Sequence, residues 1–139
     1  MADDQNKALA RRFFEAFEAN DQAALKDVLA PDLVAHAAHG APGPQSRDAL
    51  LELISMWHTV FSDQQFTIED LISEGDKIAT RSTWRAVHTG EFLGQPATGK
   101  QITMTGLTVE LVQGGRIVER WVLMDERALM RQLGLVPPS

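Results

Sequence analysis

The sequence contains no cysteine and no tyrosine among its 139 residues. Without cysteine the chain cannot form disulfides, thiol nucleophiles or thiolate metal sites, which suits a reducing compartment. Without tyrosine no phenol can donate a hydrogen bond to an oxyanion, as phenols do in several small enzymes with enclosed pockets. Any such donor in this chain must be another group.

Basic runs and long apolar runs are also missing. The formal net charge is −6 and the pI is about 5.1, so the basic patch that nucleic-acid binding requires is not expected. Residues 1–12 have no apolar run after their charges, which predicts neither a secretory signal nor a membrane span. We therefore expect a cytoplasmic protein that binds neither nucleic acid nor a membrane.

The composition is otherwise typical of a globular protein. Hydrophobic residues make up 44% of the chain and charged residues 23%. A chain of this length buries roughly 70% of its unfolded surface in one core. We expect a single domain over residues 1–139.

The first half of the chain has helical periodicity. Apolar residues recur at helical spacing in residues 5–19, which predicts an amphipathic helix. Asn20 or Asp21 can cap a second helix, which must stop before Pro31, and Ser46 can cap a third that ends near residue 62. The first two helices are expected to form an antiparallel pair.

The second half changes to the period-two pattern of strands. Residues 66–72, 77–88, 101–113 and 116–124 are rich in Val, Ile, Thr and Trp, and residues 33–36 form a further short strand. Gly-containing turns separate several of these segments. These strands are expected to form an antiparallel meander, with one face against the helices and the other against a second subunit.

Asp125 lies where the last strand pattern changes into a final helix. Ile117, Trp121, Leu123 and Asp125 share one face at period two, which we expect to meet the other helices. An Asp at a helix start is a preferred N-cap, and that role alone could explain it. If the carboxylate is instead partly desolvated beside apolar side chains, its pKa rises and it becomes a competent general base.

The register of the last hairpin follows from the glycines at 114–115. If they form a two-residue turn, Thr108 faces Trp121 and Met104 faces Asp125. The same register places Glu110 opposite Glu119. That like-charge pair is unfavourable unless solvent or a β-bulge relieves it.

Four segments of the sequence are informative together: PDLVAH, IEDLISEGDKIATRSTWRAVHTGEFLGQPATGK, GGRIVERW followed by Asp125, and MRQLG. Together they resemble the SnoaL-like polyketide cyclase (ester cyclase) family of the nuclear transport factor 2-like superfamily. The similarity spans about residues 5–135. It implies a cone-shaped α+β barrel with three N-terminal helices packed on a curved, mostly antiparallel sheet, a deep apolar pocket and a short C-terminal helix. It also implies a homodimer or larger homo-oligomer formed through the sheet.

The resemblance further implies an activity. Characterised members close a polyketide ring by intramolecular aldol condensation without a metal or cofactor, using an Asp that matches Asp125. They resemble one another in a His at the position of Thr108 in this chain, so this sequence departs from them there. His36 and His88 match frequent His positions of the wider family.

These observations define a candidate site. The expected catalytic residues are Asp125, His88 and His36. The expected substrate-binding residues are Trp57, Phe61, Trp84, Met104, Thr108 and Trp121. His36 and His39, on a Gly/Pro-rich loop, could reach the pocket mouth or be solvated. The spacing of the His residues matches no metal motif, so no metal site is expected, and the resemblance implies that no cofactor is needed.

The sequence thus predicts a cofactor-independent cyclase or isomerase acting on an apolar, carbonyl-bearing substrate. Asp125 would remove a proton from the carbon next to the carbonyl, and His88, His36 or backbone amides would stabilise the enolate. The alternative is a protein that binds a hydrophobic small molecule without chemistry, which Thr108 in place of His makes credible. Ketosteroid-isomerase and scytalone-dehydratase chemistry needs the missing Tyr.

Overall fold

The computed structural model describes residues 2–36 and 43–135. Most elements lie where the sequence predicts them, and the three strands from residue 77 onward have the predicted bounds. The elements are α1 (Ala2–Ala19), α2 (Gln22–Val28), β1 (Leu29–His36), α3 (Arg47–Val60), β2 (Phe61–Glu74), β3 (Lys77–His88), β4 (Gln101–Gln113), β5 (Arg116–Met124) and α4 (Glu126–Gln132).

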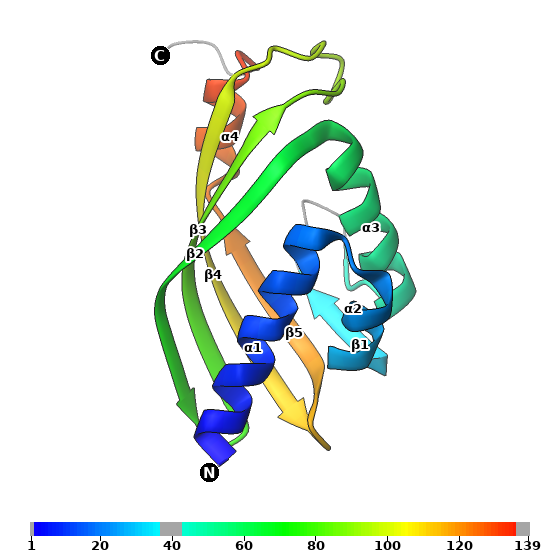
Figure 1. The fold of residues 1–139 in the computed structure, drawn as a ribbon, viewed down its shortest axis with the longest axis vertical. Coiled ribbons are helices and arrows are strands. Elements are labelled where there is room, and N and C mark those ends of the chain that lie inside the picture. Colours follow the sequence, from blue (N-terminus) through cyan, green and yellow to red (C-terminus); the bar gives the residue numbers. More distant parts are fainter. Residues whose placement is uncertain (1, 37–42, 136–139) are drawn as a thin grey trace.

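A curved sheet forms one layer of the molecule, and helices cover one of its faces (Figure 1). The strand order is β1-β5-β4-β3-β2, with β1 parallel to β5 and all other neighbours antiparallel. The sheet does not close on itself, because β1 and β2 are its two edges. The predicted α+β architecture is confirmed, with a curved, mostly antiparallel sheet.

Helix starts follow the capping signals in the sequence. The Asp21 carboxylate accepts a hydrogen bond from the Ala24 amide (3.1 Å), and the Ser46 hydroxyl accepts one from the Ala49 amide (3.2 Å). The end of α3 differs from the prediction, since Phe61 has extended backbone angles and begins β2. The strand therefore takes over directly from the helix.

The pairing of β4 with β5 contains a β-bulge. Gln113 pairs with Arg116, as the two-glycine turn predicts, but the register then skips Val118. Thr108 consequently pairs with Val122, so the prediction that it faces Trp121 is wrong. Because side chains alternate along a strand, the extra residue exchanges the two faces for the rest of β5.

This bulge removes the like-charge pair. Glu110 pairs with Arg120 in place of Glu119. Arg120 is buried, as is Val122, whereas Trp121 and Leu123 are exposed on the opposite face. The second half of β5 thus turns its even-numbered residues toward the helices.

One end of the molecule brings together the end of α3, the loop 89–100 and α4 (Figure 1). The loop meets α3 at Gly90, whose amide donates to the Val60 carbonyl (2.9 Å). Gln132 holds α4 against β4, because its side-chain amide bonds both the amide (2.9 Å) and the carbonyl (2.7 Å) of Thr103. These contacts fix the rim of the site described below.

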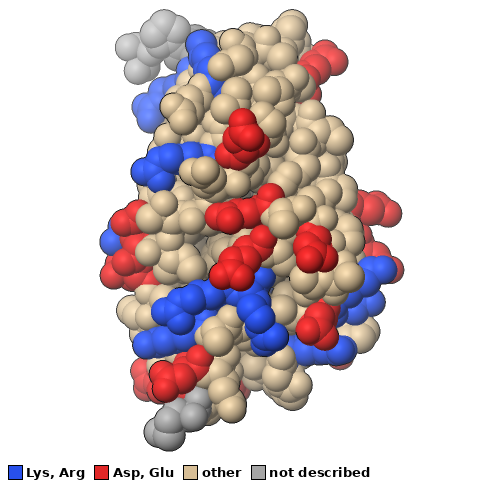
Figure 2. Space-filling model, viewed as in Figure 1, with Lys and Arg blue, Asp and Glu red and all other residues tan. Residues whose placement is uncertain are grey.

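Positive and negative side chains alternate on the face of the molecule that carries the helices. Figure 2 shows Lys and Arg side chains in a band across the lower half of this view, with Asp and Glu side chains above and below it. Among the described residues no helix combines the length and apolar character needed to cross a membrane.

Replacing Gly90 by Ala should destabilise the protein. A Cβ at this position would lie 2.3 Å from the Thr59 carbonyl oxygen, so backbone must move. We expect Gly90→Ala to lower the free energy of unfolding by about 1–3 kcal/mol, measured by urea denaturation. In the control Gly106→Ala the new Cβ meets nothing closer than 3.5 Å, and stability should stay nearly unchanged. Equal stability of the two variants would contradict the close approach at Gly90.

Candidate functional site

An apolar cavity of about 40 Å³ lies between the helices and the sheet. Its walls are mainly aromatic and methionine side chains, with a few polar groups on the sheet side. The lining residues are Phe14, Phe17, Trp57, Phe66, Ser82, Trp84, Met104, Thr105, Gly106, Thr108, Arg120, Val122 and Met124. A space of this size admits one small group, because a single water needs at least about 10–15 Å³.

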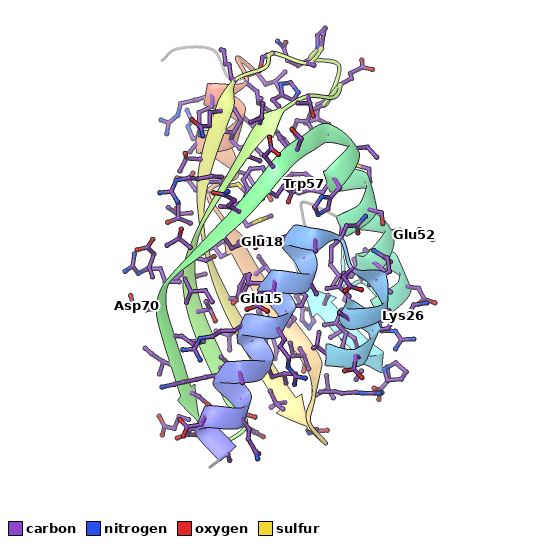
Figure 3. The ribbon with its side chains drawn as sticks, in the orientation of Figure 1. Glu15, Glu18, Lys26, Glu52, Trp57 and Asp70 are labelled. Atoms are coloured by element: carbon purple, nitrogen blue, oxygen red, sulfur yellow. The ribbon has the colours of Figure 1, made fainter. Side chains whose placement is uncertain are left out.

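A larger hollow of about 280 Å³ lies beside the cavity, at the end formed by α3, the loop 89–100 and α4. Trp57, Met104 and Met124 line both spaces and therefore separate them. Trp57 projects from α3 toward the sheet (Figure 3). We call the hollow the mouth; its other lining residues are Met56, Phe92, Leu93, Glu126, Leu129 and Met130. Unbranched methionines on its walls can change rotamer to admit ligands of different shape.

A buried ion pair lies at the sheet side of the cavity. The Nε of Arg120 donates to Oε2 of Glu110 at 3.1 Å, and the side chains are 4% and 0% exposed. The Arg120 guanidinium also lies over the Phe13 ring, 4.5 Å from its centroid. Because Arg120 is one of the lining residues, the pair places a cation in an otherwise apolar wall.

Both charges of the pair are shifted by their surroundings. Burial raises the pKa of Glu110 and lowers the pKa of Arg120, since water no longer solvates either charge, and the opposite charge of the partner offsets each shift. Several buried polar atoms nearby have no hydrogen-bond partner among the described residues. They are Glu110 Oε1, Arg120 Nη1, Thr80 Oγ1 and Thr108 Oγ1. Such unpaired groups are costly in a protein interior and need an explanation.

Sequence reasoning missed this pair. The register without a bulge placed Glu110 opposite Glu119 and turned Arg120 away from the helices. The available signal was the unfavourable pairing itself, together with Glu110 falling at period two between Thr108 and Val112 on a largely apolar strand.

Asp125 is exposed and begins α4. Its Oδ1 accepts a hydrogen bond from the Ala128 amide (3.1 Å), so the capping role is confirmed. The carboxylate lines an open groove on the outer face of the sheet, beside Arg81 and Leu123. The prediction that Asp125 shares the helix-facing side of the sheet is wrong, because the bulge exchanged the faces of β5.

His36 and Trp121 also lie on the outer face. Their rings stack at 5.3 Å with an interplanar angle of 12°, and His36 Nε2 lies 2.7 Å from Glu119 Oε2. Trp121 is 40% exposed and lines none of the described parts of the cavity or the mouth. The structure therefore does not bring these two predicted residues to the cavity.

His88 is fully buried beneath the loop 89–100. The Thr98 amide donates a hydrogen bond to its Nδ1 (3.2 Å). His88 and the loop are further joined by backbone hydrogen bonds, including that from the His88 amide to the Lys100 carbonyl (2.9 Å). These contacts hold the loop to the sheet, and His88 is not among the lining residues of the cavity or the mouth.

Four of the predicted substrate-binding residues do meet in the cavity: Trp57, Trp84, Met104 and Thr108. Phe61 is buried behind them, with its ring 4.9 Å from that of Trp57 and 5.0 Å from that of Trp84.

His39 lies outside the described residues. Within the described ranges, no three His, Asp or Glu side chains are grouped so that they could hold a metal ion.

Breaking the buried pair on one side should destabilise the protein strongly. Arg120→Met leaves the Glu110 carboxylate buried without its cation, and we expect a loss of roughly 3–5 kcal/mol in the free energy of unfolding. The double variant Glu110→Leu/Arg120→Met removes both charges and should recover most of that loss in urea denaturation.

The surface pair of Arg81 and Asp70 supplies a control, because its side chains are 54% and 59% exposed. Arg81→Met should cost less than about 1 kcal/mol. If Arg120→Met lowers the free energy of unfolding no more than Arg81→Met does, the ion pair of Glu110 and Arg120 is not buried as described.

The sequence and the fold both match known proteins. The profile of the SnoaL-like polyketide cyclase family matches residues 7–133. The structure resembles IdmH of Streptomyces antibioticus, a candidate polyketide cyclase, with 34% sequence identity and a TM-score of 0.83, covering 91% of this chain and 96% of that one. No curated protein matches the sequence.

Other solved structures share the fold. AclR of Streptomyces galilaeus, a candidate hydroxylase, has 27% identity and a TM-score of 0.84, with 94% of this chain and 96% of that chain covered. A SnoaL-like polyketide cyclase candidate from Jannaschia has 18% identity and a TM-score of 0.83, with coverage of 98% and 95%. The match over nearly the whole chain shows that the protein belongs to the SnoaL-like polyketide cyclase family.

Proposed function

We propose that the protein is a cofactor-independent enzyme that closes a ring in a polyketide-type substrate, by removing a proton from a carbon next to a carbonyl group. The observation that carries the proposal is the apolar mouth and cavity with the Arg120 guanidinium in its wall. Membership of the family supports the same reaction class.

The two spaces suit different parts of such a substrate. The mouth, with its Met, Phe and Leu side chains, takes the apolar bulk of the molecule, while the cavity of about 40 Å³ takes one slim end. Displacing water from these walls strengthens each electrostatic interaction between substrate and protein.

Asp125 is the general base that the family resemblance implies. Its neighbours in the chain are Met124, which lines cavity and mouth, and Glu126, which lines the mouth, while its own carboxylate lines the outer groove. Oδ1 caps α4, so the proposal assigns proton transfer to Oδ2. The proton moves from the substrate carbon to the carboxylate, and the carboxylic acid returns it to the alkoxide that ring closure creates.

The variant Asp125→Asn separates the capping role from the catalytic one. Asn caps a helix about as well as Asp, so stability should be unchanged, whereas turnover should fall roughly 10²-fold because the amide cannot accept the proton. Asp21→Asn is the matched control, since Asp21 caps α2 in the same way away from the site. Unchanged turnover in Asp125→Asn, measured on a polyketide-type substrate, would show that Asp125 is only a cap.

A ligand-binding protein without chemistry is the second candidate. It is favoured by the exposure of Asp125 on the outer face, away from the cavity. Such a protein would return bound polyketide-type molecules unchanged, even over long incubation, while still protecting them from solvent. Product formation by the wild-type chain excludes this candidate.

We also propose that a second copy of the chain covers the outer face of the sheet. Large apolar side chains are exposed there, among them Leu107, Val109, Trp121 and Leu123. Patches of this kind on a sheet mark protein interfaces.

Leu123→Lys should therefore weaken the dimer, because it places a charge at the most exposed of these apolar positions, 71% accessible. Sedimentation velocity should give twice the 15.3 kDa chain mass for the wild type and a shift toward a single chain for the variant. Leu93→Lys is the matched control, since Leu93 is 67% exposed on the loop 89–100. A wild type that sediments as a single chain would contradict the proposal.

A further inference from the structure

We propose that Arg120 and Thr108 form an oxyanion-binding site in the wall of the cavity, which holds the enolate oxygen of a slim 1,3-dicarbonyl group. Glu110 is the positioning residue that fixes the guanidinium. The inference rests on the proposed function and deepens it by naming the part of the substrate that enters the cavity.

The first evidence is a pair of buried donors at the cavity. Arg120 Nη1 and Thr108 Oγ1 are buried and have no hydrogen-bond partner among the described residues, and both residues line the cavity. A guanidinium N–H can only donate, so its missing partner must be an acceptor. Glu110 Oε1 is an unpaired acceptor of the same ion pair, and we assign an oxygen atom of a bound molecule as a second acceptor for the guanidinium.

The second evidence is the charge of the wall. Arg120 is the one ionisable side chain among the lining residues of the cavity, and the rest of the wall is mainly apolar. In such surroundings a fixed cation stabilises negative charge far more than it would in water. The site therefore favours an oxygen that becomes negative during the reaction over one that stays neutral.

Glu110 explains how the guanidinium is held in place. Its Oε2 accepts from Nε, and the Phe13 ring supports the guanidinium at 4.5 Å, so the side chain is fixed before a ligand arrives. Donors that need no reorientation stabilise the developing charge without a reorganisation cost. The ion pair also keeps the empty cavity close to neutral.

The size of the cavity limits the group that it accepts. A volume of about 40 Å³ holds a carbonyl with a small substituent, whereas a ring must stay in the mouth beyond Met104 and Met124. The substrate class is thus a polyketide-type chain with a slim 1,3-dicarbonyl end, whose acidic central carbon gives a stable enolate.

The test compares two ligands by ¹⁹F NMR titration. Trifluoroacetylacetone is used at a pH where it is an enolate, and a trifluoromethyl monoketone of the same length serves as the neutral counterpart. The wild-type protein should bind the enolate roughly tenfold more tightly, because a charge-assisted hydrogen bond is stronger than a neutral one.

Two variants remove the site in different ways. Glu110→Leu/Arg120→Met leaves no buried charge, and Thr108→Val keeps the ion pair but removes the hydroxyl. The double variant should lose the preference for the enolate, with only a smaller loss of affinity for the monoketone, whose neutral oxygen accepts a weaker hydrogen bond. Thr108→Val should lose part of the preference. Arg85→Met, at an exposed position on β3, is the control and should bind both ligands as the wild type does.

Each outcome decides the inference. The inference is overturned if the double variant still prefers the enolate, or if it loses affinity for both ligands equally. It is also overturned if the wild-type protein shows no preference. The proposed function fails separately: a wild type that prefers the enolate but converts no polyketide-type substrate keeps the binding site and loses the reaction. Turnover that survives in the double variant keeps the reaction and overturns the role of Arg120.

Discussion

The β-bulge at Val118 is the constraint on which the rest of the site depends. One extra residue in β5 pairs Glu110 with Arg120 and turns Arg120 toward the helices. It also turns Trp121 and Asp125 to the outer face. A hairpin without the bulge would place two carboxylates opposite each other and leave the interior without a cation.

The buried pair gives the cavity its chemical character. Aromatic and methionine side chains alone would bind any apolar molecule of suitable shape. The guanidinium adds a fixed, partly unsatisfied donor in a medium of low dielectric, so the site can distinguish the charge state of a ligand. The mouth depends on other contacts. Gly90 and His88 hold the loop 89–100, and Gln132 holds α4 against β4.

The sequence predicted the elements of the fold well because their signals are local. Capping residues such as Asp21 and Ser46 act within one helical turn, and the strand bounds follow from alternation, glycine turns and β-branched residues. Trp84 and Met104 line the cavity from β3 and β4, whose faces the extra residue in β5 does not exchange. The sequence by itself therefore determined the order, the kind and most of the bounds of the elements.

Only the tertiary structure decided which side chains share a site. The face of each residue in β5 depends on its partner across the sheet, and a shift of one position exchanges the two faces. For this reason Asp125 and Trp121 lie outside the cavity, and Arg120 lies in its wall. The burial of Glu110 against Arg120 is a non-local choice, made when β4 and β5 pair and α1 covers them. The period-two pattern of β4 places Glu110 on the buried face, but it does not identify the partner.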